Sequence, residues 1–311
     1  MNKVRIYCDW DLLSDFESEI AVELFVDNRW RISRGKTHKV LYVCEPESIF
    51  PHMVDVAINN QGSFHHILTH NEKILAHCKN AILFEFGGTW IPDTYEFKEK
   101  HFSISTVVGQ KTATSGHKMR HVLWERQAEI KNPKCFYQSR HGGPTTFLDN
   151  PILVSTKDVM FDSQFHVSIE NSSLKYYFTE KLLDCFRTKT IPIYWGCPNI
   201  GDYFNLDGMI VAKNVDEIIA ACNYINPATY ASMRSAIEDN YRRSDKYKNL
   251  SKRLDEKLGE IIYLPGNLPS LSNPWQSTSR IFDAVKEIGC FKWIIQQLRR
   301  LKRRIFALVG R

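Results

Sequence analysis

Asn171, Glu180 and Lys181 stand where one short segment of the chain changes direction. Residues 165–169 alternate between apolar and polar side chains, which predicts a half-buried strand. A helix is predicted to begin at Glu180, and the apolar run 191–195 predicts a second strand. A strand–helix–strand unit belongs to a parallel sheet, and such sheets bind ligands at the carboxyl ends of their strands. We therefore expect the three polar side chains to converge on one crevice.

The chemistry of this crevice points to a diphosphate. A helix N-terminus presents free N–H groups to an anion, and a lysine there opposes the helix dipole unless a negative charge offsets it. Lys181 therefore predicts a phosphate partner. Glu180 could accept hydrogen bonds from sugar hydroxyls, and Asn171 could donate to phosphate oxygens or simply form a turn. Tyr177 could pack against a nucleotide or be an ordinary core aromatic.

The residues around this crevice carry a resemblance to a known family. The runs ENS at 170–172, YYFTEKL at 176–182 and IPIYWG at 191–196 resemble the donor-binding core of the α-1,3/4-fucosyltransferases, glycosyltransferase family 10. The resemblance implies an α/β fold of two Rossmann-like domains facing across a cleft, called GT-B. It also implies an inverting transfer of fucose from GDP-fucose to a glycan hydroxyl, with α-1,3 linkage to an N-acetylglucosamine-type acceptor and no essential metal.

Two further residues gain a predicted role from the resemblance. Arg120, near the start of a predicted helix, would clamp the diphosphate, although a solvated helix arginine is the simpler alternative. Glu45, directly after the predicted strand 40–43, would be the general base that takes the acceptor proton. Glu47 competes for this role, and either glutamate could merely begin a surface turn before a proline.

Two other functions stay open at this stage. The predicted phosphate-binding residues do not determine which sugar is bound. A GT-B transferase that uses another nucleotide sugar therefore fits the same pattern. A catalytically inactive, membrane-docked glycan-binding protein is the alternative outside the enzymes. The histidines and cysteines show no metal-ligand spacing, and we expect no metal site.

Length and composition predict two domains and a tail. The 311 residues, 43% of them hydrophobic, are enough for two cores. We predict an acceptor-side Rossmann-like domain at 1–98, a donor-binding Rossmann-like domain at 99–265, and an extended connection with a C-terminal helix at 266–311. Scattered cysteines and a first segment that does not resemble a signal peptide suggest a cytoplasmic protein.

The positive charge of the chain is concentrated at its end. The formal net charge is +6, and residues 292–311 contain seven Lys or Arg and no acidic residue. A basic face spread over a folded domain is therefore absent, which argues against a nucleic-acid partner. Apolar residues recur at helical spacing between the basic ones, which predicts a helix that binds an anionic membrane surface. A helix docked on the body of the protein fits the same pattern.

The remaining elements follow from local periodicity. Helices are predicted at 17–25, 71–77, 119–129 and 215–224. Strands are predicted at 4–7, 40–43, 54–58, 64–68, 81–84, 102–108 and 209–211.

Overall fold

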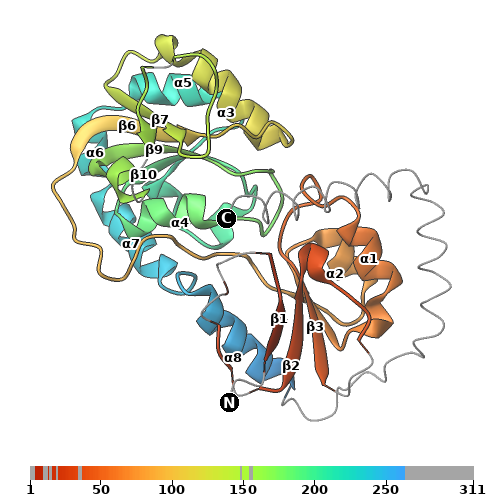
Figure 1. Ribbon diagram of the computed structural model, residues 1–311. Helices are drawn as coiled ribbons and strands as arrows, with labels where there is room; N and C mark the ends of the chain where they lie inside the picture. Colours follow the sequence, from red (N-terminus) through yellow and green to blue (C-terminus); the bar gives the residue numbers. More distant parts are fainter. Residues whose placement is uncertain are drawn as a thin grey trace, which may run out of the picture.

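The chain folds into two α/β domains, each built on a parallel sheet (Figure 1). The computed structural model describes residues 4–9, 13, 16–18, 20–33, 37–147, 149–153 and 157–262. The predicted fold class is confirmed. The predicted tail at 266–311 lies outside the described residues, and the predicted domain boundaries stay predictions.

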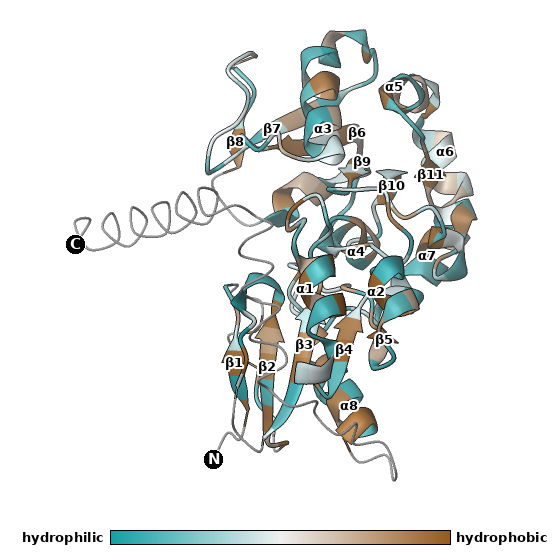
Figure 2. Ribbon diagram, turned by 90° about the vertical axis from the view of Figure 1, so that its right-hand side faces the viewer, coloured by the Kyte–Doolittle hydropathy of each residue, from teal (hydrophilic) through white to brown (hydrophobic). Residues whose placement is uncertain are grey.

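The first sheet has the strand order β1-β2-β3-β4-β5, with every pair parallel. Its strands are β1 (Arg5–Tyr7), β2 (Val22–Val26), β3 (His38–Val43), β4 (His66–Thr69) and β5 (Ala81–Leu83). Its helices are α1 (Met53–Asn59) and α2 (Glu72–His77). Most strand residues are apolar (Figure 2), as expected for a parallel sheet that is covered on both faces, although Glu23, Lys39 and His66 are polar.

The second sheet has the order β11-β10-β9-β6-β7-β8. Its strands are β6 (His101–Val108), β7 (Lys134–Ser139), β8 (Ile152–Leu153), β9 (Ser163–Ile169), β10 (Ile191–Trp195) and β11 (Ile210–Val211). Its helices are α3 (Ser115–Glu125), α4 (Glu180–Arg187), α5 (Val215–Tyr224), α6 (Pro227–Ser232) and α7 (Arg234–Ser244). The order reverses between β6 and β9, and a crevice for ligands is expected at such a switch point.

The predicted unit around α4 is confirmed. β9 and β10 run parallel in register, with Phe165 opposite Ile191, and α4 connects them. Thr179 is the N-cap of α4, and its hydroxyl accepts the backbone N–H of Lys181 at 3.3 Å. This cap starts the helix at Glu180, where the sequence pattern placed it.

Two predicted elements are wrong, and both errors lie in the first domain. The helix expected at 17–25 is replaced by β2, whose five residues are all buried. A strand buried on both faces shows no alternation, so its pattern cannot be told from that of a buried helix. The strand expected at 54–58 is the helix α1, which buries Met53, Val54 and Ala57 at helical spacing. Its β-branched residues favour a strand locally, but packing against the sheet decides otherwise.

The final described helix, α8 (Leu250–Ile262), packs on the first domain although it follows the second in sequence. Its residues Leu250, Leu254 and Leu258 are buried in the same cluster as Leu24 and Val40 of the first sheet. The opposite face of that sheet is covered by α1 and α2 (Figure 1). The first domain is therefore completed by the end of the described chain. No described helix has the length and apolar character needed to cross a membrane.

Candidate active site

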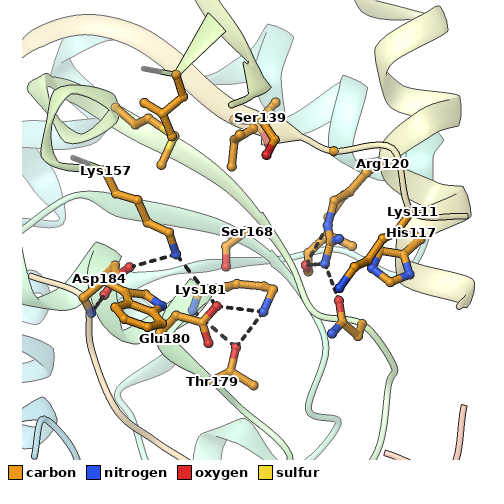
Figure 3. Close-up of a pocket in the computed structure, with 18 of the residues that line it drawn as sticks. Lys111, His117, Arg120, Ser139, Lys157, Ser168, Thr179, Glu180, Lys181 and Asp184 are labelled. Carbon is orange, nitrogen blue, oxygen red and sulfur yellow. Dashed lines mark hydrogen bonds and ion pairs between the residues drawn. The ribbon is translucent and has the colours of Figure 1, made fainter. Parts of the chain in front are cut away.

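A cavity of about 940 Å³ lies where residues from both domains meet. All six residues predicted from the sequence line it: Glu45, Arg120, Asn171, Tyr177, Glu180 and Lys181. Arg120 and His117 lie at one end, Lys157 and Asp184 lie at the other, and Lys181 lies between them (Figure 3). The structure thus brings the six residues together, while their individual roles stay predictions.

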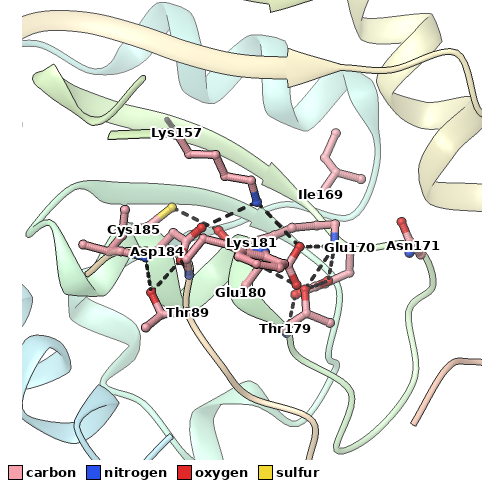
Figure 4. A network of polar contacts seen from close by, with 12 residues as sticks. Thr89, Lys157, Ile169, Glu170, Asn171, Thr179, Glu180, Lys181, Asp184 and Cys185 are labelled. Atoms are coloured by element: carbon pink, nitrogen blue, oxygen red, sulfur yellow. Dashed lines mark hydrogen bonds and ion pairs between the residues drawn. The ribbon is translucent and has the colours of Figure 1, made fainter. Parts of the chain in front are cut away.

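Lys181 is surrounded by carboxylates of its own chain. Its Nζ lies 2.9 Å from Glu180 Oε1 and 4.0 Å from Glu170 Oε2 (Figure 4). Burial lowers the pKa of Lys181, but the two carboxylates outweigh it, so the net shift is upward. Lys181 therefore does not require a bound phosphate, contrary to what the sequence pattern predicted, because the protein supplies anions itself. A diphosphate at this site would compete with them for the ammonium group.

Glu170 supports the site from behind without lining the cavity, and the sequence analysis assigned it no role. Its side chain is fully buried, and its carboxylate accepts the backbone N–H and the hydroxyl of Thr179, each at 2.8 Å. Burial raises its pKa. In the sequence, Glu170 occupies a polar position of an alternating strand pattern. Its position directly after β9, just before the turn, is the signal that could have indicated a role. Glu170 fixes the N-cap residue and hence the start of α4.

Arg120 joins α3 to the end of β9. Its guanidinium donates to the carbonyl oxygen of Ile169 at 3.1 Å from Nε and 2.5 Å from Nη2, and to Asn171 Oδ1 at 3.0 Å. The helix can approach so closely because it carries Gly116, where an added Cβ would lie 1.7 Å from the carbonyl oxygen of Glu170. With Oδ1 of Asn171 accepting from Arg120, the amide NH₂ of Asn171 is the group suited to donate to a ligand.

The other end of the cavity holds a second charged group. Lys157 Nζ lies 3.8 Å from Glu180 Oε1 and 3.7 Å from Asp184 Oδ2. Burial opposes ionisation of Glu180, but Lys181, Lys157 and hydrogen bonds lower its pKa to about 2. Glu180 is therefore a permanent hydrogen-bond acceptor in the cavity, as a partner for sugar or ribose hydroxyls would need to be. The second oxygen of Asp184 accepts from the hydroxyl of Thr89 at 2.6 Å.

Tyr177 is both a core aromatic and a residue that lines the cavity, the two possibilities that the sequence left open. It is 2% exposed and therefore belongs to the core, yet it also lines the cavity. Its ring lies 4.9 Å from that of His70, measured between ring centroids, and this contact joins the two domains.

Glu45 comes to the cavity from the first domain, at the end of β3. Burial, reinforced by the negative charge of Asp27, raises its pKa to about 7. Glu47 does not line the cavity and forms an ion pair with Lys73, at 2.9 Å between Nζ and Oε1. Of the two glutamates, Glu45 therefore has both the position and the pKa of a general base.

Metal ligands do not gather in this part of the protein. Among the described residues, no group of three or more His, Cys, Asp or Glu side chains could hold a metal ion.

The sequence and the structure resemble known glycosyltransferases. Residues 153–249 match the family "Glycosyltransferase family 10 (fucosyltransferase) C-term". The resemblance seen in the motifs is confirmed. Asn171, Tyr177, Glu180 and Lys181 lie inside the residues that match this family, whereas Glu45 and Arg120 precede them.

One sequence relative is the α-(1,3)-fucosyltransferase FucT of Helicobacter pylori, which is 27% identical over 170 residues. The match covers 50% of this chain and 35% of the relative, so the matched half of the chain spans about a third of that protein.

Solved structures extend the similarity to the whole fold. The crystal structure of an α-1,3-fucosyltransferase with GDP-fucose superposes with a TM-score of 0.50, at 17% identity and 79% coverage of each chain. A complex of S. aureus TarM with UDP superposes with a TM-score of 0.53, at 12% identity, over 78% of this chain and 55% of TarM. At these identities the likeness establishes the GT-B fold alone.

Proposed function

We propose that the protein is an inverting glycosyltransferase that moves fucose from GDP-fucose to a hydroxyl group of a glycan. The observation that carries the proposal is the single cavity in which Glu45 of one domain meets Arg120, Asn171 and Lys181 of the other. A base on one side and positive groups on the other are the two requirements of a transfer from a nucleotide sugar.

In the proposed reaction the acceptor hydroxyl attacks the anomeric carbon of the donor sugar. Glu45 takes the hydroxyl proton, the new bond forms between the acceptor oxygen and the anomeric carbon, and the bond to the diphosphate breaks with its electron pair. Arg120 and Lys181 stabilise the charge that develops on the leaving diphosphate, and Asn171 donates a hydrogen bond to it. Attack opposite the leaving group inverts the configuration at the anomeric carbon.

The choice of GDP-fucose as donor rests on the match of residues 153–249 to family 10 and on the relatives named above. The proposed acceptor is an N-acetylglucosamine-type glycan, linked α-1,3. TarM, which has the same fold, was crystallised with UDP, so the fold by itself is compatible with another nucleotide. The experiment must therefore compare nucleotides.

A thermal-shift screen of GDP, UDP, ADP and CMP in the presence of EDTA tests the donor first. We expect GDP to raise the melting temperature most, since a bound ligand stabilises the folded state by mass action. GDP-fucose with and without N-acetyllactosamine then tests the transfer, with release of GDP as the readout. Stabilisation by UDP alone would favour the other nucleotide sugars, and GDP binding with no transfer to any glycan would favour an inactive glycan-binding protein.

We also propose that the protein is cytoplasmic and that residues 292–311 hold it at an anionic membrane surface. Seven basic residues there would each contribute about 1 kcal/mol of attraction to anionic lipid, and salt would screen that attraction. Sedimentation with phosphatidylserine vesicles at low and high salt tests it. Binding that does not depend on salt, or that persists in a chain ending at residue 262, would contradict it.

A further inference from the structure

Asp27 supports the peptide that carries Glu45. It directly follows β2, while Glu45 comes just after the neighbouring strand β3. One oxygen of its carboxylate, Oδ1, accepts the backbone N–H of Cys44 at 2.9 Å and that of Glu45 at 3.2 Å. The other oxygen, Oδ2, accepts the thiol of Cys44 at 2.9 Å. Three donors from two consecutive residues therefore converge on one buried carboxylate.

The backbone of Asp27 adopts an unfavourable conformation to make these contacts. Its φ is 44°, in the left-handed region that residues other than glycine adopt at a cost. The side chain is 2% exposed and does not line the cavity. Asp27 therefore cannot touch a substrate, and the hydrogen bonds described for its side chain go to Cys44 and Glu45.

We propose that Asp27 is a positioning residue for Glu45, which holds the peptide at the end of β3 and places a second negative charge behind the Glu45 carboxylate. This inference rests on the proposed role of Glu45 as the base. Asp27 would set both the position of the Glu45 carboxylate and the pH at which Glu45 ionises.

Charged and titratable groups surround Glu45 from three directions. The Asp27 carboxylate and the neutral Cys44 thiol face it from the first domain. Glu180 and Lys181 face it from α4, and Lys111 faces it from the loop before α3. Burial is the largest cause that raises the pKa of Glu45, Asp27 and Glu180 raise it further, and the two lysines lower it. Asp27 is the only one of these charges that is tied to the Glu45 peptide itself.

Asp27→Asn is the decisive variant. Asparagine has the same shape, tolerates the left-handed region and keeps Oδ1 as an acceptor, but it lacks the charge. We expect the pKa of Glu45 to fall by about one unit, the lower end of the effect of a charge within ~6 Å. Carboxyl ¹³C NMR of glutamate-labelled protein measures this directly, with the Glu45 signal assigned by its loss in Glu45→Gln. If the variant transfers fucose, the acid limb of kcat/KM should move down by the same amount.

A measurement on the wild-type protein avoids any loss of folding in the Asp27 variant. Burial raises the pKa of Asp27 to about 6 and that of Glu45 to about 7, so Asp27 should ionise first, and the Glu45 carboxyl signal should respond to that step because the two groups are coupled. Labelled glutamate and aspartate report the two titrations. Cys44→Ala, which removes the thiol but keeps both carboxylates, should leave the pKa of Glu45 within a few tenths of a unit.

The outcomes separate the inference from the proposed function. An unchanged Glu45 titration in Asp27→Asn, or a wild-type Glu45 signal that does not respond to the titration of Asp27, would overturn the inference even in an active enzyme. Absence of any sugar transfer by the wild-type protein would instead overturn the proposed function, and the titrations would still report whether the carboxylates are coupled.

Discussion

The hydroxyl of Ser48 lies 2.6 Å from the hydroxyl of Ser172, and this hydrogen bond links the two domains. Ser48 is three residues beyond Glu45, and Ser172 directly follows Asn171. The turn that carries the proposed base is thereby joined to the turn that faces the proposed diphosphate site. Nearby, Lys175 of the second domain forms an ion pair with Glu72 of the first at 3.1 Å.

Ser48→Ala should reduce turnover while leaving GDP affinity unchanged, since the proposed GDP contacts come from the second domain. A hydrogen bond of this kind contributes about 0.5–1.5 kcal/mol, so kcat should fall by up to about tenfold. Steady-state kinetics and calorimetry measure the two effects. Glu72→Gln is the matched control, because its exposed ion pair is expected to contribute little. Equal kinetics for Ser48→Ala and the wild type would show that the contact does not position the base.

Lys181→Ala and Arg120→Ala should each weaken GDP binding by roughly 1.5–3 kcal/mol, the range for hydrogen bonds to charged groups. Calorimetry with EDTA present measures this. Arg120→Ala should also lower the melting temperature, because it leaves the carbonyl of Ile169 and the amide of Asn171 without their donor. Lys252→Ala, an exposed lysine on α8, serves as the control for a lost positive charge. GDP affinity that survives both cavity substitutions would remove the phosphate-site assignment.

Glu45→Gln should reduce turnover by about 10²-fold or more, with GDP affinity nearly intact. Wild-type kcat/KM should rise with pH through about 7, because Glu45 must lose its proton to act as a base and its pKa is raised to about that value. Glu47→Gln should stay active and show the same pH profile, since Glu47 pairs with Lys73 outside the cavity. An inactive Glu47 variant beside an active Glu45 variant would move the base by two residues.

The protein should lose stability in mild acid because of buried neutral histidines. Burial lowers the pKa of His70 from 6.5 to about 4, and among the described contacts neither ring nitrogen has a hydrogen-bond partner. The unfolded chain therefore binds the extra proton first, and stability falls as the pH drops from about 6.5 towards 4. His70→Phe keeps the ring against Tyr177 and should remove about 2 kcal/mol of this loss at pH 5.

Urea unfolding at pH 7 and pH 5 measures the effect, as the difference between the two pH values for each protein. His77→Phe is the control, since His77 is exposed on α2. An equal loss of stability in the wild type and His70→Phe would show that His70 is already protonated in the fold or does not contribute.

The donor side of the fold and site could be predicted from the sequence because its signals are local. The cap at Thr179 and the two strands around α4 lie within about 30 consecutive residues, and short-range periodicity describes them. The errors arose where tertiary packing decides, as in β2 and α1, which are covered by elements distant in sequence. Asp27 was missed for a similar reason, because its hydrogen bonds reach Cys44, 17 positions away on the neighbouring strand. Glu170 lies within the local segment, and it was missed because it occupies a polar position of an alternating strand pattern.

The return of α8 to the first domain has a consequence for biosynthesis. One face of the first sheet, including Leu24, Val40 and Tyr42, is covered by a helix that begins only at Leu250. A ribosome therefore releases β1 to β5 long before their cover exists, and this apolar face must wait for more than 150 further residues to be translated. A fragment ending near residue 98 should aggregate, and mixing it with a peptide of residues 249–262 should restore its solubility. Nicking the chain between β5 and β6 in the finished protein should, by contrast, leave the two pieces associated.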